Sequence, residues 1–208
     1  MGDKNTRDLI LNVSLKLFSE QGFYRTSTRQ IAEKAKVNLS AIKYYFGDKS
    51  GLYKAAYLEP MSPVKEKISL FHNQQDLEKS LLGVFEGMFD LLKGDDKIQL
   101  CLNLHMREMI EPTEFWDENF NNEVLPYYKA LLYVIKKEIP QINDGDAHRL
   151  IFSIKGLVFY VFSNIRVIEK ISPNLIKDDE ALDVWKNKVI SYATTVINAE
   201  KGLYENKV

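Results

Sequence analysis

The chain has 208 residues, enough for one or two domains with a substantial core. Hydrophobic residues make up 45% and charged residues 27%, as in globular proteins, which excludes collagen-like, low-complexity and disordered classes. The first residues are polar and lack the apolar stretch of a secretory signal, so we expect a cytoplasmic protein without a membrane segment. A single cysteine, Cys101, excludes an intramolecular disulfide and cannot alone build a zinc site. We expect neither a metal nor a cofactor.

The formal net charge of −1 conceals an uneven distribution. Residues 1–54 carry ten Lys or Arg against five Asp or Glu, a net charge of +5, so the remaining residues sum to −6. A basic segment joined to an acidic one indicates that the first meets a polyanion. A basic surface can also serve solubility alone, and the charge count does not separate the two.

The first predicted helix shows a helical repeat of apolar residues and ends at Gly22. Glycine adopts the left-handed conformation that commonly closes a helix, and Phe23 can then fold back onto the last turn. The inward face of this helix is formed by Ile10, Val13, Ser14, Leu17 and Phe18.

Three capping signals follow within 22 residues. Ser27 and Gln30 form a capping box, in which each side chain satisfies the other's free backbone N–H, at the start of a helix over residues 28–35. After a tight connection, Asn38 caps a helix that runs to residue 46. Asp48 caps a fourth helix.

Two short helices joined by about three residues predict a helix-turn-helix. Its second helix must be narrow enough for the major groove of DNA, while the first packs across it. We expect Ala32 and Ala35 to be the small contact residues and Ile31 to fill the core. In the second helix, we expect Leu39, Ile42 and Phe46 to face inward and Lys43, Tyr44 and Tyr45 to face outward. A helix cannot bury three consecutive side chains, so at least one tyrosine should be exposed.

Only helices are predicted in the rest of the chain, and the fold class is all-α. Pro60 and Pro63 interrupt the fourth helix, because proline lacks the backbone donor that a helix needs. We expect a helix-turn-helix domain over residues 1–55 and a regulatory and dimerisation domain over residues 56–208. The later helices are predicted at about residues 64–71, 75–93, 97–110, 117–139, 145–171 and 179–203.

One run of residues extends from Gly22-Phe23 through Ser27-Thr28-Arg29-Gln30-Ile31-Ala32 and Ile42-Lys43-Tyr44-Tyr45-Phe46-Gly47-Asp48-Lys49 to Leu52-Tyr53. With this run, roughly residues 6–55 resemble the N-terminal domain of the TetR family of transcriptional regulators. The resemblance implies phosphate contacts at the start of the second helix and base contacts from the third. Lys49 should bind a phosphate at the start of the fourth helix, where free N–H groups attract anions. The implied DNA-binding residues are Ser27, Thr28, Arg29, Asn38, Ser40, Ala41, Lys43, Tyr44, Tyr45 and Lys49.

Two residues depart from the family pattern. Lys36 stands in the turn where the family usually has glycine, and a side chain at positive φ there costs about 1 kcal/mol. Tyr45 stands where histidine is common, so its groove contacts should differ. An outward lysine such as Lys43 is more often a solvated charge than a DNA contact, and the combination of residues, rather than any one of them, indicates DNA reading.

The two long C-terminal segments are predicted to dimerise by the same resemblance, because the family pairs its last two helices with those of a second subunit. Residues 150–162 are apolar almost all round, too short for a membrane span and interrupted by Lys155, so we expect a helix buried on several sides. A homodimer would read a palindromic operator with reading helices roughly 34–36 Å apart. The last helix carries the stripe Leu182, Trp185, Val189, Tyr192 and Val196.

The middle helices should enclose a small-molecule pocket, again by resemblance. His105 and Glu108 lie one turn apart and either orient each other toward a ligand or form a hydrogen-bonded surface pair. Residues 107–112 also resemble a subgroup with a CecR-like C-terminal domain. The candidate ligand-binding residues are Phe85, Met88, Phe89, Leu104, His105, Glu108, Trp116, Phe120, Tyr128, Phe159, Phe162 and Asn164.

Together these features predict a DNA-binding transcriptional regulator, a repressor that a small-molecule effector releases from its operator. Three histidines, one cysteine and no HExxH, GxSxG or phosphate-loop motif leave no recognisable catalytic constellation, so we expect no enzyme. The alternative is a DNA-binding protein of the same fold with an architectural role.

Overall fold

A computed structural model describes residues 2–62, 77–94 and 96–205. In these ranges all regular elements are helices, which confirms the all-α class. The helix predicted at 64–71, and Pro63, lie outside the described residues. The chain forms two compact units, Met1–Pro63 with Gly94–Asn119 and Val64–Lys93 with Phe120–Val208, and each is considered by itself.

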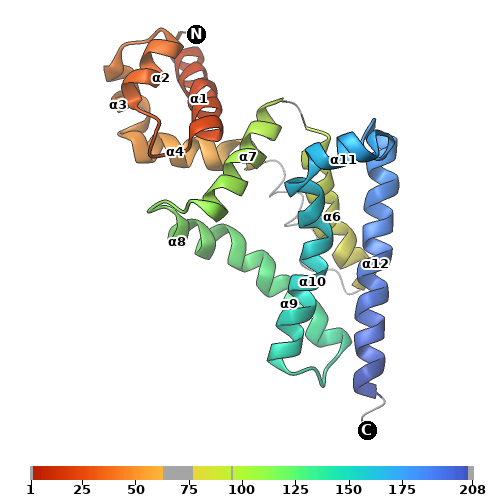
Figure 1. The fold of residues 1–208 in the computed structure, drawn as a ribbon. Helices are drawn as coiled ribbons and strands as arrows, with labels where there is room; N and C mark the ends of the chain where they lie inside the picture. The colour runs from red at the N-terminus through yellow and green to blue at the C-terminus, as the bar shows by residue number, and fades with distance from the viewer. Residues whose placement is uncertain (1, 63–76, 95, 206–208) are drawn as a thin grey trace. The chain divides into compact units, whose positions relative to one another are not determined.

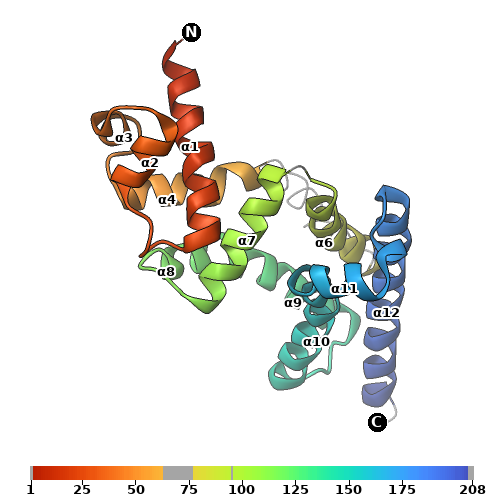
Figure 2. The same cartoon turned by 45° about the horizontal axis from the view of Figure 1, so that its top comes forward.

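The first unit begins with four helices around one core (Figures 1 and 2). As predicted, Gly22 ends the first helix at φ 82°, and the Phe23 ring returns to stack on Phe18 with 6.2 Å between ring centroids. The predicted inward residues of this helix are buried except Val13, which is half-buried. These helices are α1 (Gly2–Gln21), α2 (Thr28–Ala35), α3 (Leu39–Phe46) and α4 (Lys49–Leu58), followed by the short η1 (Glu59–Met61).

The predicted caps begin α2, α3 and α4. The side-chain oxygens of Asn38 and Asp48 accept from the backbone N–H groups of Ser40 and Gly51, at 2.9 and 2.8 Å. Ser27 likewise accepts from the N–H of Gln30 at 3.1 Å. The second half of the capping box was wrong, because the Gln30 amide donates to the side chain of Gln21 instead, at 3.2 Å.

The helix-turn-helix packs as expected except at Leu39 and Tyr45, since Tyr45, predicted to face outward, is half-buried against the core of the first unit. Ile31, Ala32, Ala35 and Ile42 are buried. Leu39, predicted to face inward, is 45% exposed, because it is the first residue of α3 and the neighbouring α2 has already ended at Ala35.

Two later helices, α7 (Asp96–Ile110) and α8 (Trp116–Asn119), complete the first unit. Arg107 of α7 donates to the carbonyls of Ser19 and Glu20, at 3.4 and 3.3 Å. Carbonyls in the last turn of a helix lack intrahelical donors and attract cations, so Arg107 ties α7 to the end of α1.

The second unit packs α6 (Leu77–Leu92) beside the long α12 (Asp179–Glu205), as Figure 1 shows. The other helices are α9 (Leu125–Glu138), α10 (Asp144–Ser163) and α11 (Ile165–Ile171), with a short η3 (Pro173–Leu175). Its core is apolar and includes Phe85, Phe89, Leu131, Ile135, Ile151, Ile154, Val158, Ile190 and Ile197.

Two predicted helices are interrupted. The helix at 117–139 consists of α8, a π-helical segment η2 (Phe120–Val124) and α9. The helix at 145–171 breaks at Asn164, where the backbone leaves helical geometry, and α10 and α11 meet at a bend of 71°. In the described part of the chain no single helix is long and apolar enough to cross a membrane, and only this bent pair, counted together, reaches that length and composition.

The expectation that residues 150–162 are buried on several sides was also wrong for the single chain. One side of α10 is buried, and the opposite side exposes Phe152, Phe159 and Tyr160. The stripe predicted on α12 divides in the same way, since Leu182 and Val189 are buried whereas Tyr192 and Val196 are exposed.

Candidate nucleic-acid interface

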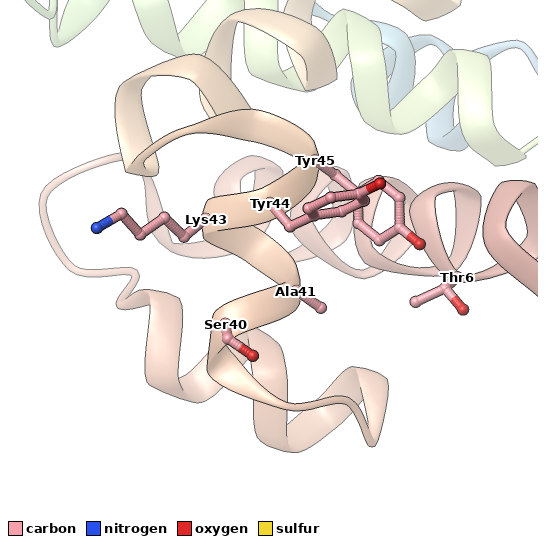
Figure 3. Close-up of a pocket in the computed structure, with 6 residues that line it drawn as sticks. All are labelled: Thr6, Ser40, Ala41, Lys43, Tyr44 and Tyr45. Atoms are coloured by element: carbon pink, nitrogen blue, oxygen red, sulfur yellow. The ribbon is translucent and has the colours of Figure 1, made fainter.

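Helix α3 is anchored on one side and open on the other. Ile42 is 1% exposed in the core, whereas Lys43 is exposed and Tyr44 is 76% exposed. Ser40, Ala41, Lys43, Tyr44 and Tyr45 line an open depression of about 520 Å³ (Figure 3). A helix with this pattern can present side chains to a groove while its core contacts hold it in place.

Thr6 of α1 completes this depression and was missed in the sequence. Figure 3 shows Thr6 opposite the tyrosine pair, with Lys43 extending in another direction. The rings of Tyr44 and Tyr45 meet edge to face, with centroids 4.9 Å apart. The exposure of Tyr44 confirms that one tyrosine of the triplet faces outward. No local sequence signal connects residue 6 with residues 40–45.

The side chain of Arg7 holds the start of α1 near α3. Its guanidinium donates to both carboxylate oxygens of Glu59, at 3.0 and 2.5 Å. It also lies 5.0 Å from the centroid of the Phe46 ring, at the end of α3. The two-pronged hydrogen bond and the ring contact fix the direction of the guanidinium.

Two helix N-termini flank α3 with candidate phosphate contacts. At the start of α2, Ser27 and Arg29 are exposed and Thr28 is half-buried. At the start of α4, Lys49 is half-buried, and burial lowers the pKa of its ammonium group. Free backbone N–H groups at such positions favour anions.

Gly51 allows α4 to start close to the end of α3. A Cβ atom at this position would lie 2.1 Å from the carbonyl oxygen of Phe46. Only glycine therefore fits here without a backbone shift, and its place in the first turn of α4 sets where Lys49 is held.

A buried carboxylate lies behind α4. Glu108 of α7 is 0% exposed and accepts hydrogen bonds from the Tyr53 hydroxyl and from the backbone N–H and hydroxyl of Thr113, the latter two at 2.9 and 2.8 Å. Burial and the hydrogen bond to Glu108 raise the pKa of Tyr53, so this phenol stays neutral. The contact joins α4 to α7 across 55 residues of sequence.

His105 has other partners than the predicted Glu108. Its Nδ1 lies 2.8 Å from the carbonyl oxygen of Cys101, and its ring stacks on Tyr57 with centroids 3.7 Å apart. Asn119 of α8 donates to the Tyr57 hydroxyl at 2.9 Å. The two tyrosines of α4 are thus held by polar groups of α7 and α8.

The candidate effector residues divide between the two units, and the pocket stays a prediction. Leu104, His105, Glu108 and Trp116 belong to the first unit, and the others to the second. Phe85, Phe89, Leu104 and Glu108 are fully buried, whereas Phe120 and Phe159 are 38% and 40% exposed. Tyr128 pairs with His148 through its hydroxyl. Asn164 donates to the Tyr160 carbonyl at 3.2 Å, and Met88 and Phe162 pack on the core of the second unit.

Two curated relatives align with parts of the chain. It is 34% identical over 91 residues to the probable HTH-type transcriptional regulator YttP of Bacillus subtilis (strain 168), covering 42% of each chain. It is 29% identical over 146 residues to the HTH-type transcriptional dual regulator CecR of Shigella flexneri, covering 64% of each. The chain therefore spans less than two thirds of the length of either relative.

Solved structures share the fold over most of the chain. The hemolysin II transcriptional regulator HlyIIR superposes with a TM-score of 0.63 at 19% identity, covering 92% of this chain and 98% of the other. The SmeT–triclosan complex superposes with a TM-score of 0.56 at 17% identity, covering 87% and 90%.

Two family models match consecutive parts of the chain. Residues 10–56 match the model of bacterial regulatory proteins of the tetR family. Residues 77–199, more than half of the chain, match the model of the C-terminal domain of the HTH-type transcriptional dual regulator CecR. The chain therefore belongs to the TetR family of bacterial regulatory proteins and carries a C-terminal domain of the CecR type.

Proposed function

We propose that this protein is a sequence-specific DNA-binding transcriptional regulator whose helix α3 enters the major groove. The observation that carries the proposal is the division of α3 into a buried side at Ile42 and an open side at Ser40, Lys43 and Tyr44. Polar side chains on a helix of this width can read base edges in the major groove. Arg29 and Lys49, at the starts of α2 and α4, supply phosphate contacts on either side.

The regulator acts as a homodimer that pairs through α10 and α12. Phe152, Phe159 and Tyr160 are exposed on α10, and Tyr192, Val196 and Leu203 are exposed on α12. A set of large apolar side chains on neighbouring helices is typical of an interaction surface. A second copy suits this surface, because a two-fold axis brings the same patch to both partners and imposes a palindromic operator.

The dimer represses its target genes while it is bound to DNA, and a small-molecule effector releases it from the operator. The support is the family itself and SmeT, which shares the fold and was solved with triclosan. An effector acts only through a difference in its affinity for the DNA-bound and released states. The candidate residues on α6 to α10 are where we expect it to bind.

Selection of binding sequences from a random DNA pool tests DNA reading, followed by Lys43→Ala, Lys49→Ala and the control Lys188→Ala in α12. We expect a palindromic site. Lys49→Ala should weaken all sequences about equally and lower the salt slope by about two units, one for each protomer of the dimer, whereas Lys43→Ala should change which sequences are preferred. If the selection yields no enriched site, the protein does not read DNA sequence.

Sedimentation of the wild type and of Phe159→Glu tests the dimer. A charge in an apolar interface is unpaired, so the variant should be monomeric at concentrations where the wild type is a dimer.

Expression profiling of a deletion strain tests regulation. A repressor should derepress a few genes near its operator, whereas an architectural protein should not.

A further inference from the structure

The ring of Phe23 is held on several sides. This residue follows the glycine that ends α1, and its ring lies 6.2 Å from Phe18, 5.4 Å from Tyr24 and 5.0 Å from Tyr53, measured between centroids. Phe18 and Tyr53 are 0% and 2% exposed. Tyr53 is in turn fastened to the buried Glu108. The Phe23 ring therefore has a defined orientation before any ligand arrives.

The ammonium group of Lys49 lies over this ring, 4.2 Å from its centroid. A ring face attracts a cation electrostatically, and it leaves N–H donors of the ammonium group available to oxygen. Among the described residues, no carboxylate lies within ion-pair distance of Lys49. Lys49 would thus not have to give up an ion pair in order to bind a phosphate.

We propose that Phe23 is a positioning residue, whose ring holds the Lys49 ammonium group beside the N-terminus of α4, ready for a DNA phosphate. The inference rests on the proposed function, and it adds Phe23, which is not among the residues predicted to contact DNA. An exposed lysine loses much side-chain entropy when it is fixed on a ligand. A lysine already held by a ring loses less, and the lowered pKa from burial agrees with an ammonium group that has partly lost its water.

This role differs from ordinary core packing. Leucine at position 23 would keep apolar contacts with Phe18 and Tyr53, but it has no π face for a cation. Tryptophan would keep the face and strengthen its attraction. The pair of substitutions therefore separates a hydrophobic contribution of Phe23 from an electrostatic one.

The test measures operator affinity and its salt dependence for the wild-type protein, Phe23→Leu, Phe23→Trp, Lys49→Ala and the double variant Phe23→Leu/Lys49→Ala. Lys49→Ala should weaken binding about tenfold for each protomer of the dimer at 0.1 M salt, the share of one phosphate contact apiece. Phe23→Leu should weaken it severalfold and lower the salt slope, and it should add nothing when Lys49 is already alanine. Phe23→Trp should bind at least as tightly as the wild type does.

Lys43→Ala is the matched control, because Lys43 makes no contact with the Phe23 ring in the described structure, so its effect should add to that of Phe23→Leu. Proton chemical shifts of the Lys49 side chain give a readout independent of DNA, since an overlying ring moves them upfield and Phe23→Leu should abolish the shift. Additive losses for Phe23→Leu and Lys49→Ala overturn the inference alone. A wild-type protein that selects no operator overturns the proposed function as well.

Discussion

The two compact units differ in what their cores contain. Among the described residues, each residue that is both polar and buried lies in the first unit: Ser14, Ser19, Thr26, Glu108 and Asn119. The buried cluster of the second unit, from Phe85 and Phe89 to Ile197, consists of apolar residues. Both cores are apolar clusters, and the first adds directional contacts between helices, such as those of Glu108 with Tyr53 and of Asn119 with Tyr57.

This difference shows which unit has the more strictly determined arrangement of helices. A buried polar group must find its partner at one distance and angle, so it specifies one arrangement of the helices that carry it. An apolar core needs only the right volume and pattern and tolerates exchange of side chains. The contacts of Glu108 and Asn119 therefore make the interior of the first unit more specific than the apolar core of the second.

Each unit contains one tryptophan, which allows the two to be followed separately. Trp116 lies in α8 of the first unit and Trp185 in α12 of the second. Trp185→Phe leaves a reporter of the first unit, and Trp116→Phe leaves a reporter of the second. Fluorescence during urea unfolding then gives a free energy of unfolding for each.

The largest expected effect is the loss of volume in the second unit. Phe89 is 0% exposed, and Phe89→Ala should lower the free energy of unfolding reported by Trp185 by about 4 kcal/mol, because it removes buried surface and leaves a cavity. Tyr133→Ala on α9 is the control, since Tyr133 is 66% exposed and should change stability by less than about 0.5 kcal/mol. Equal losses for the two would mean that Phe89 is not a core residue.

A slightly smaller effect is expected from a polar group in the first unit. Glu108→Ala should cost about 3 kcal/mol in the Trp116 signal, because the Tyr53 hydroxyl and Thr113 lose their buried acceptor. Glu108→Gln keeps an oxygen at this place and should cost less. Glu111→Ala, an exposed glutamate one turn away, is the matched control. If Glu108 tolerated alanine as well as Glu111 does, the first core would not depend on directional contacts.

The features that the sequence predicted correctly are local. The caps at Ser27, Asn38 and Asp48 join groups at most three residues apart, and the left-handed end of α1 follows from Gly22 alone. The open side of α3, where Tyr44 is exposed, was likewise predicted from the pattern of neighbouring residues.

What the sequence did not predict depends on residues far apart. Thr6 lines the depression on α3, and Tyr53 meets Glu108, only because the tertiary fold brings them together. The break at Asn164 was missed for another reason, since the apolar pattern continues across it and no proline or glycine marks it.

Lys36 offers a test of opposite sign in the first unit. It is the one non-glycine residue with positive φ in the described part of the chain, at 54°, as its place in the turn suggested. Lys36→Gly should raise the free energy of unfolding reported by Trp116 by about 1 kcal/mol or somewhat less, because glycine adopts this conformation without strain. Lys36→Ala keeps a Cβ atom and should bring no comparable gain. A gain for both variants would trace the effect to the lysine charge instead.

The smallest expected effect is the response of the second unit to acid. The pKa of Asp183 is held below its ordinary value by hydrogen bonds from Lys93 and Lys186, at 2.6 and 2.9 Å. A carboxyl group whose pKa is lower in the folded state stabilises the fold fully above its unfolded pKa of about 3.9, and this contribution disappears as the pH falls through the folded value. The Trp185 signal should therefore report falling stability below about pH 4, and Asp183→Asn should make the fall shallower. Because the Asp183 side chain is 43% exposed, added salt should weaken the effect, whereas it should leave the cost of Phe89→Ala unchanged. An unchanged pH profile in Asp183→Asn would show that neither the contact with Lys93, which follows α6, nor the contact with Lys186 within α12 contributes to stability.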